Sequence, residues 1–315
     1  MVTSRLACPD CPKTFPWRAG LNRHRKATHA YVYDPRIPHV TILPKPSDDD
    51  LAHAAGFIEG DGCISIQGTT PSVSAAQTIK KKELLHDLLR IFGVGVITKC
   101  SDETLTRTEK WEWRCTAAES IAVCKLLHEF LVQKARVAKV FSTMEPIEQC
   151  GRNTPHNRAC IAKYNTVKKT FMEIDELDAI ACTGGRTVNF TDLVNRGFEF
   201  RDLSMHYIAG FFEAEGCIVI RKLTRGKAHT LAVTIAQKEL YILYLVLAKL
   251  KIGQVNFESR GCGKYSVNGS FAIDVLKALQ PFLRSPAMKE QVRIVLEDGV
   301  NATSKLELVQ YKAKR

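Results

Sequence analysis

The sequence has no run of 18 or more apolar residues, so it offers no candidate for a membrane-spanning helix. It has no apolar signal segment after Met1. Acidic residues are also in deficit, because 33 Asp and Glu stand against 45 Lys and Arg, a formal net charge of +12. This excess favours a polyanionic partner, with nucleic acid as the first choice. An anionic membrane surface is the rival, but the basic residues are spread along the chain, so we expect no membrane partner.

The cysteine content argues against a secreted disulfide scaffold. The 11 cysteines are an odd number in a long chain of 315 residues. An intracellular, reducing compartment that contains DNA fits better. Cys63 and Cys217 lie in apolar, strand-like runs, where a thiol is usually a small core residue, so we expect both to be buried.

The length and the hydrophobic share of 45% allow two globular units and something smaller. Residues 1–31 are basic and residues 32–47 contain several prolines, which predicts a small module followed by an extended linker. Ser47 can cap a helix whose first turn holds the acids Asp48 to Asp50. A new domain is therefore predicted to begin at residue 48.

The chain contains an internal repeat. The segment from Ala55 to Ile64 recurs as Ala209 to Ile218, a shift of 154 residues. The elements predicted downstream recur in the same order. We therefore expect an α+β fold in which an α-β-β-α-β-β-α unit is used twice with antiparallel sheets, over residues 48–180 and 204–315, with a linker at 181–203.

Periodicity gives the elements of each unit. Glycine is expected to stop the helix after the first strand pair, at Gly93 in the first unit and Gly253 in the second. One further helix, Ala159 to Ile180, should close the first unit. The predicted strands are Cys63–Gln67, Val73–Gln77, Val94–Lys99, Glu109–Cys115, Cys217–Arg221, Thr230–Gln237, Gln254–Ser259 and Lys264–Val267, and the predicted helices between them are Lys80–Phe92, Ala118–Leu131, Lys238–Ile252 and Phe271–Leu283.

The repeated segment has the pattern of a helix that packs closely and ends in an acid. Gly56 with Gly60, and Gly210 with Ala214, are spaced by four residues, so each pair shares one helix face and lets another backbone approach. Two such helices can pack together.

Asp61 and Glu215 lie in the last turn of these helices, where the negative end of the helix dipole disfavours further negative charge. A divalent cation shared by the two carboxylates would compensate, and Mg²⁺ prefers oxygen ligands. A lone acid more often caps a turn or pairs with a lysine. Recurrence at equivalent places in a basic repeat protein favours the metal site.

The two motifs resemble the LAGLIDADG signature, and the repeated element order resembles that of the single-chain, two-repeat LAGLIDADG homing endonucleases. The resemblance extends from about Leu51 to the C-terminus. It implies a monomer that acts as a pseudo-dimer, with paired motif helices and two curved antiparallel sheets along the DNA major groove. It also implies that Asp61 and Glu215 bind catalytic Mg²⁺, that Glu59 and Glu213 are structural, and that the carbonyls of Gly60 and Ala214 complete the coordination.

Further site residues follow from the same resemblance. A glutamine after the second strand helps to order the nucleophilic water, and Gln77 and Gln237 stand at that point. A lysine near the start of the basic helix is the remaining element, at Lys134 in the first unit. In the second unit Lys289 matches only after a small insertion, so one strand could be cut more slowly if Lys289 is misplaced.

Strand alternation assigns side chains to the faces of the predicted sheets. Ile64 and Ile66 should face the core with Ser65 and Gln67 opposite, and the repeat places Ile218 and Ile220 inward with Val219 and Arg221 outward. Gln67 and Arg221 can make bidentate contacts with bases, and Arg260 is a further DNA-binding candidate. A solvated polar residue is the alternative for each.

The N-terminal module resembles a two-cysteine, two-histidine zinc finger with a ββα fold. Cys8, Cys11, His24 and His29 have the spacing of tetrahedral zinc ligands, two from a hairpin and two from one helix face. Phe15 and Leu21 fall at its apolar core positions. Its DNA contacts are expected from Arg18, Arg23, Arg25 and Lys26, mostly to phosphates. A protein-binding or structural finger is the alternative.

Together these features predict a Mg²⁺-dependent, site-specific endonuclease that cuts both strands of DNA, with structural Zn²⁺ in the finger. An RNA maturase acting on its host intron is the main alternative, and a non-catalytic DNA-binding regulator is the third. The regulator would be favoured by loss of a motif acid, and both Asp61 and Glu215 are present.

Overall fold

The computed structural model divides into two compact units, Met1–His39 and Val40–Arg315. It describes residues 6–7, 14–15, 46–67, 70–101, 108–144, 155–156, 158–168, 187–195, 197–198, 200–223, 228–258 and 262–314. In the first unit, strands β1 (Leu6–Ala7) and β2 (Thr14–Phe15) pair antiparallel, with Leu6 opposite Phe15. The predicted zinc ligands Cys8, Cys11, His24 and His29, and the basic residues Arg18, Arg23, Arg25 and Lys26, lie outside the described residues. The zinc finger therefore stays a prediction.

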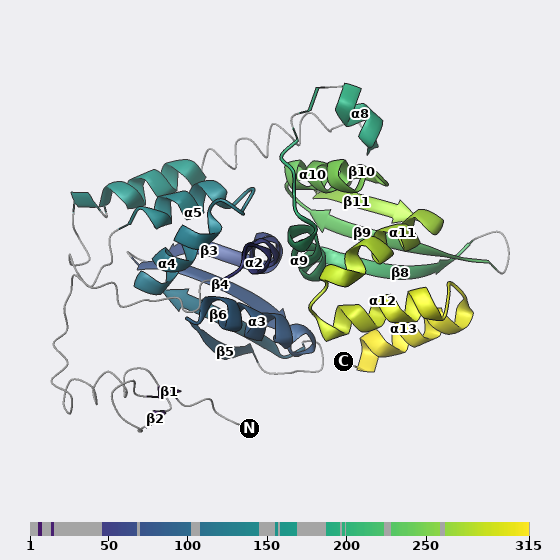
Figure 1. The fold of residues 1–315 in the computed structure, drawn as a ribbon, viewed down its shortest axis with the longest axis horizontal. Coiled ribbons are helices and arrows are strands. Elements are labelled where there is room, and N and C mark those ends of the chain that lie inside the picture. The colour runs from purple at the N-terminus through teal and green to yellow at the C-terminus, as the bar shows by residue number, and fades with distance from the viewer. Residues whose placement is uncertain are drawn as a thin grey trace. The chain divides into compact units, whose positions relative to one another are not determined.

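The second unit begins with the first repeat, which has the predicted order of elements (Figure 1). Its elements are α2 (Asp48–Asp61), β3 (Gly62–Gln67), β4 (Thr70–Thr78), η1 (Ile79–Lys81), α3 (Lys82–Phe92), β5 (Val96–Ser101), β6 (Lys110–Thr116), α4 (Ala118–Leu127) and α5 (Ala135–Ser142). Of the helix expected over 159–180, residues 158–168 are helical and 169–180 lie outside the described residues.

The second repeat follows the same order. Its elements are α9 (Met205–Glu215), β8 (Gly216–Lys222), β9 (His229–Gln237), α10 (Leu240–Leu250), β10 (Gln254–Glu258), β11 (Cys262–Asn268), α11 (Ser270–Leu279), η2 (Gln280–Phe282), α12 (Pro286–Glu297) and α13 (Ala302–Lys314). The twice-used α-β-β-α-β-β-α unit is thus confirmed. Within the described residues, none of the helices is both long and apolar enough to cross a bilayer.

Each repeat builds one antiparallel sheet. The first has the strand order β3-β4-β6-β5, and the second has β7-β10-β11-β9-β8. The extra strand β7 (Val188–Asn189) and helix α8 (Phe190–Asn195) come from the segment 181–203, which we expected to be a linker. Val188 is buried opposite Val255 of β10, so the burial of an apolar side chain makes this piece part of the second sheet.

Glycine stops only one of the two helices as predicted. Gly93 caps α3 in the left-handed conformation with φ 62°, and its N–H donates to Leu89 O. The same prediction for Gly253 is wrong, because α10 ends earlier and Lys251 takes the left-handed position with φ 56°. Gly253, with φ 94°, is needed instead for close packing, since a Cβ there would lie 2.8 Å from Ser266 O.

In the part of the chain that the structure describes, each sheet has one face buried under helices and an opposite, open face that carries exposed side chains. Helices α3 and α4 cover the first sheet, and α10 and α11 cover the second. Ile64, Ile218 and Ile220 are buried as predicted, and Ile66 is partly buried against the core. The prediction for Cys63 and Cys217 is wrong: both are exposed, because alternation puts them on the opposite face from the isoleucines that follow.

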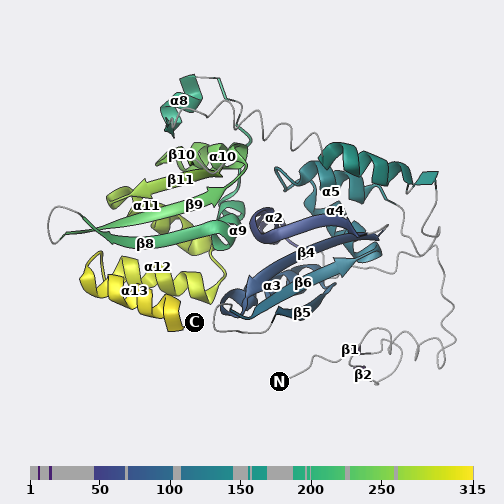
Figure 2. The ribbon, with the colours of Figure 1, turned by 180° about the vertical axis from the view of Figure 1, so that it is seen from behind.

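Helices α2 and α9 lie side by side at the junction of the repeats (Figures 1 and 2). Ser47 and Ser204 cap them, each accepting a backbone N–H three residues on. The two glycines bring the backbones together with pseudo-twofold symmetry. A Cβ on Gly56 would lie 2.0 Å from Tyr207 O, and one on Gly210 would lie 2.1 Å from His53 O. The close approach expected from the glycine spacing is confirmed.

Gly56→Ala is expected to lower the free energy of unfolding by about 3 kcal/mol or more, because the added methyl group meets rigid backbone. Urea denaturation measures this. Gly197→Ala is the control: its φ is 63° but no atom lies within 4 Å of an added Cβ. Its free energy of unfolding should fall by only about 1–2 kcal/mol, the cost of a left-handed backbone conformation for alanine. Equal losses in the two variants would contradict the packing argument.

Candidate active site

The two motif acids lie at adjacent helix ends. Asp61 is the last residue of α2 and Glu215 is the last residue of α9. A Cβ on Gly60 would lie 2.9 Å from Glu215 Cγ and 2.5 Å from Ala214 Cβ. The Glu215 side chain therefore lies directly against the last turn of α2, one residue before Asp61.

Burial and like charge act together on these acids. Burial first, and then the charge of Glu215, raise the pKa of Asp61 to about 7, against the opposing charges of Lys81 and Lys134. Burial also raises the pKa of Glu215, and the same two lysines lower it. The site holds two carboxylates that are costly to ionise together without further positive charge.

The Asp61 carboxyl makes stability depend on pH. Its pKa rises on folding from an ordinary 3.8 to about 7, so the folded state binds the proton more tightly. In metal-free protein, the stabilisation of the fold by protonated Asp61 is fully present below about pH 4 and is lost as the pH rises towards 7.

Asp61→Asn, which is neutral, should therefore stabilise the metal-free protein at pH 8 by about 2 kcal/mol, roughly half the full shift because the group is partly exposed. It should give no such gain at pH 4. Denaturant midpoints in the presence of EDTA measure this. Asp274→Asn, on the exposed face of α11, should change stability at pH 8 by less than about 0.5 kcal/mol. A gain that is equal at both pH values would be inconsistent with the raised pKa.

The earlier motif acids are buried and bind backbone. Glu59 accepts the N–H groups of Val132 and Lys134 at 2.7 and 2.8 Å, and the Tyr207 hydroxyl at 3.0 Å. Because Tyr207 belongs to α9, this acid also joins the two repeats.

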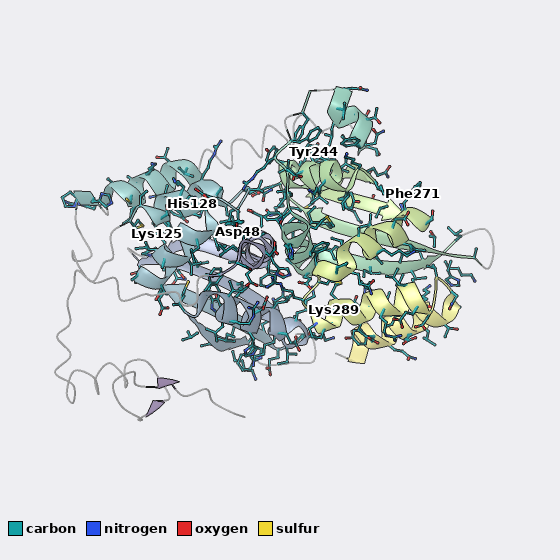
Figure 3. All side chains as sticks on the ribbon, viewed as in Figure 1. Asp48, Lys125, His128, Tyr244, Phe271 and Lys289 are labelled. Carbon is teal, nitrogen blue, oxygen red and sulfur yellow. The ribbon has the colours of Figure 1, made fainter. Side chains whose placement is uncertain are left out.

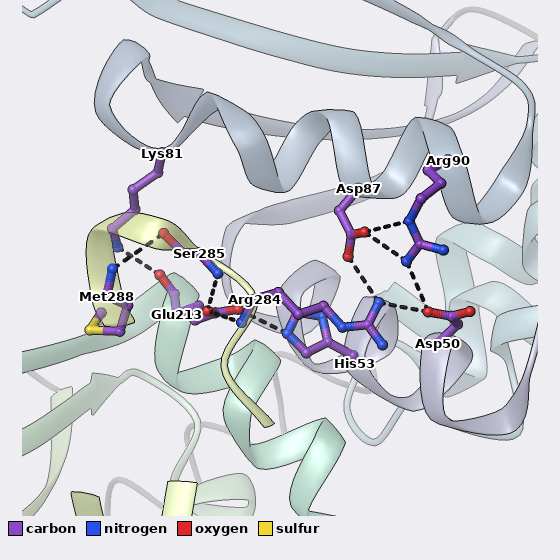
Figure 4. A network of polar contacts seen from close by, with 9 residues as sticks. All are labelled: Asp50, His53, Lys81, Asp87, Arg90, Glu213, Arg284, Ser285 and Met288. Atoms are coloured by element: carbon purple, nitrogen blue, oxygen red, sulfur yellow. Dashed lines mark hydrogen bonds and ion pairs between the residues drawn. The ribbon is translucent and has the colours of Figure 1, made fainter. Parts of the chain in front are cut away.

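Glu213 has a matching set of contacts in the second repeat (Figure 4). It accepts the N–H groups of Arg284 and Ser285 at 2.7 and 2.6 Å, and it bonds to His53 Nε2 of α2 at 2.8 Å. Both acids therefore anchor the start of a later helix of their own repeat and cross to the other one, as expected for structural residues.

An ammonium group lies at the C-terminal end of each motif helix. Lys134 Nζ donates to the carbonyls of Ile58, Glu59 and Gly62 at 2.6–2.8 Å. Lys81 Nζ donates to the carbonyl of Glu213 at 2.6 Å. These contacts satisfy carbonyls left open by the helix ends and place positive charge beside the acids.

The structure brings together part of the predicted set. Gln77 Nε2 donates to Asp61 Oδ2, so Asp61, Glu215, Gln77 and Lys134 form one cluster. Gln237 instead accepts the backbone N–H of Lys238 at 2.7 Å.

Lys289 lies one turn into α12 with an exposed side chain (Figure 3). Sequence reasoning placed a lysine there and missed Lys81. The run Lys80-Lys81-Lys82 after Gln77, set against Lys238-Glu239 after Gln237, was the available signal.

The open sheet faces carry the other candidates. Gln67 and Arg221 are exposed and Ser65 is half-buried, while Arg260 lies outside the described residues. Strand register adds Arg114 of β6 and Lys264 of β11 to the faces that hold Cys63 and Cys217. Arg114 pairs with Glu112 at 2.8 Å.

The donor set fits a hard divalent cation. Two carboxylates with raised pKa face one site, and positive charge there would favour their ionised forms. The carbonyls of Gly60 and Ala214 belong to the same helix turns and offer further oxygen donors. In the described part of the chain, no group of three or more His, Cys, Asp and Glu side chains could hold a metal ion.

Comparison with known proteins agrees with the fold described above. Residues 208–293, which contain the second motif, match the sequence profile of the LAGLIDADG endonuclease family. The fold is that of the LAGLIDADG meganucleases. The structure of I-SmaMI bound to cleaved DNA is 14% identical with a TM-score of 0.57, and the match covers 85% of this chain and 97% of that one.

Two more structures show the same likeness. LAGLIDADG meganuclease I-AabMI bound to uncleaved DNA is 16% identical with a TM-score of 0.54, covering 84% of this chain and 98% of that one. The I-LtrWI homing endonuclease bound to target DNA is 14% identical with a TM-score of 0.53, covering 85% and 98%. No curated protein is significantly similar in sequence.

Proposed function

We propose that this protein is a site-specific endonuclease that cuts both strands of double-stranded DNA and acts as a monomer with two pseudo-symmetric halves. One observation carries the proposal: two acids from pseudo-symmetric helices, Asp61 and Glu215, meet at the junction of two antiparallel sheets with open faces. The DNA-bound LAGLIDADG structures that share this fold, and the net charge of +12, support DNA as the partner.

We propose Mg²⁺ as the cofactor, held by Asp61, Glu215 and the carbonyls of Gly60 and Ala214. When bound, the cation supplies positive charge to the attacking and leaving oxygens of a phosphodiester. Gln77, bonded to Asp61, is placed to orient a water molecule for in-line attack on phosphorus, after which the bond to the leaving sugar oxygen breaks. Lys134 holds the carbonyls that surround Asp61.

DNA contacts are assigned to the open sheet faces and to the N-terminal module. Ser65, Gln67, Arg221 and Arg260 would read bases from the sheets. A zinc finger with Cys8, Cys11, His24 and His29 would extend the footprint through phosphate contacts by tethering. Such a protein would work in a reducing, DNA-containing compartment.

Purified protein incubated with a randomised double-stranded DNA library, in Mg²⁺ or in Ca²⁺, tests the function. Cuts at one long, roughly two-fold site, made in Mg²⁺ and not in Ca²⁺, are expected when the ends are sequenced. Zinc content is measured in the same preparation. No enriched cut site with folded protein at low salt would reject the endonuclease, leaving the intron RNA maturase and the non-catalytic regulator; RNA splicing and DNA binding assays then separate these two.

A further inference from the structure

The residues that start α5 and α12 are structural counterparts of different charge. Lys134 caps α5 and donates its N–H to Glu59, and Ser285 caps α12 and donates its N–H to Glu213. Ser285, rather than Lys289, therefore stands where Lys134 stands in the first repeat. The Glu215 end of the site receives no ammonium group from this position.

A second pair of corresponding helix starts differs in the same sense, with the lysine again in the first repeat. Lys81 precedes α3 and Glu239 precedes α10. Lys81 Nζ reaches across the repeats to the carbonyl of Glu213 at 2.6 Å (Figure 4). Lys134 Nζ makes the same contact with the carbonyl of Glu59, also at 2.6 Å.

The counterpart of Lys81 lies at the Asp61 end. The carbonyl of Glu239 accepts Gln133 Nε2 at 3.3 Å, next to Lys134. Each end of the site thus receives one helix start from each repeat: Lys134 and Glu239 at the Asp61 end, Ser285 and Lys81 at the Glu215 end. As a result, one lysine from these helix starts lies at each end of the site, Lys134 at Asp61 and Lys81 at Glu215. The two lysines occupy non-equivalent positions in the repeat.

The surroundings of Lys81 agree with a role at the acids. It is half-buried, and Asp61, Glu213 and Glu215 are the acids whose charges oppose the effect of burial on its pKa.

We propose that Lys81 is the positioning residue for the DNA strand cut at Glu215, supplied by the first repeat in place of the lysine that the second repeat lacks at Ser285. This inference rests on the proposed function. Through the Glu213 carbonyl, Lys81 fixes the last turn of α9 and so the backbone of Ala214 and Glu215. It also supplies the positive charge that this helix end needs while both acids are ionised.

The test uses the target site recovered from the library, with each strand labelled at its end, and single-turnover cleavage in saturating Mg²⁺. Lys81→Met keeps the length of the side chain and removes its charge. It is expected to slow one strand by roughly 10- to 100-fold more than the other, and Lys134→Met should slow the opposite strand. Lys81→Arg should restore most of the rate, which a purely steric role would not predict.

Controls separate positioning from folding and binding. Lys277→Met, on the exposed face of α11, should leave both strands unaffected. Affinity for the target in Ca²⁺ should change less than about threefold in Lys81→Met, because cleavage and not docking is affected. Without metal or DNA, its urea midpoint at pH 8 should be lower than that of Lys81→Arg. Lys81→Gln, which can still donate to the Glu213 carbonyl, replaces Lys81→Met if that variant does not fold.

The outcomes are distinct. Equal rates on both strands in Lys81→Met, or a strand-specific loss in Lys289→Met in its place, would overturn the inference while leaving the endonuclease intact. A wild-type protein that cuts no library site would overturn both together.

Discussion

The double variant Asp61→Asn, Glu215→Gln is expected to cleave the recovered target at least roughly 10³-fold more slowly than wild type, with near-normal binding in Ca²⁺. The substitutions keep the size of each side chain and remove the charges that would hold the cation, and a bound metal contributes several kcal/mol to transition-state stabilisation. Single-turnover gel assays and a filter-binding titration measure the two effects.

Binding should survive because the acids lie at helix ends, whereas the candidate DNA contacts Ser65, Gln67 and Arg221 lie on strands β3 and β8. Asp274→Asn on α11 is the matched control and should cleave at the wild-type rate. Cleavage by the double variant within tenfold of wild type would remove the proposed metal site.

Glu59→Ala is expected to lower the free energy of unfolding by about 3 kcal/mol or more. Three donors lose their buried acceptor: the N–H groups of Val132 and Lys134 and the Tyr207 hydroxyl. Each unsatisfied buried donor costs about 1–3 kcal/mol. Glu213→Ala should behave in the same way, since Glu213 is fully buried and anchors Arg284 and Ser285.

Two variants make this prediction specific. Tyr207→Phe removes one of the three donors together with its need for a partner, so it should lose less, about 1.5–3 kcal/mol. Glu83→Ala, exposed in the first turn of α3, should change stability by less than about 0.5 kcal/mol. Thermal or urea unfolding gives all three values, and a Glu59→Ala protein as stable as the Glu83→Ala control would show that the buried acid is dispensable.

Much of the fold was predictable because three signals can be found in the sequence itself: the internal repeat, the strand alternation and the glycine spacing. The recurrence of Ala55–Ile64 at Ala209–Ile218 gave both motif helices, and alternation gave the inward isoleucines of β3 and β8. The glycine spacing predicted the close approach of α2 and α9, because residues without a Cβ on one helix face let another backbone pack against it.

The failures have a common physical cause, which is tertiary context. Strand β7 has only two residues and forms because Val188 meets Val255, a contact 67 positions away along the chain that no local pattern predicts. The exposed Cys63 and Cys217 were misjudged from residue type, although their position relative to the isoleucines predicts their face.

The site was predictable only where the two repeats follow the same pattern. Gln77 and Lys134 lie at Asp61, as the resemblance implied. For the second repeat, shifting the pattern along the chain led to Lys289, because a linear comparison looks for a lysine within the same repeat. Lys81 lies 132 positions before its contact at Glu213 and comes from the other half of the molecule.

Because the corresponding helix starts of the two repeats differ in charge, the two halves would not be equivalent as separate proteins. A homodimer of the first half would hold Lys81 and Lys134 together at both ends of its site, whereas a homodimer of the second would hold Glu239 and Ser285 and no lysine from these positions. If the two halves descend from one duplicated gene, the second has become dependent on the first. Of the two halves, only the first holds the two lysines, Lys81 and Lys134, that lie at the acids.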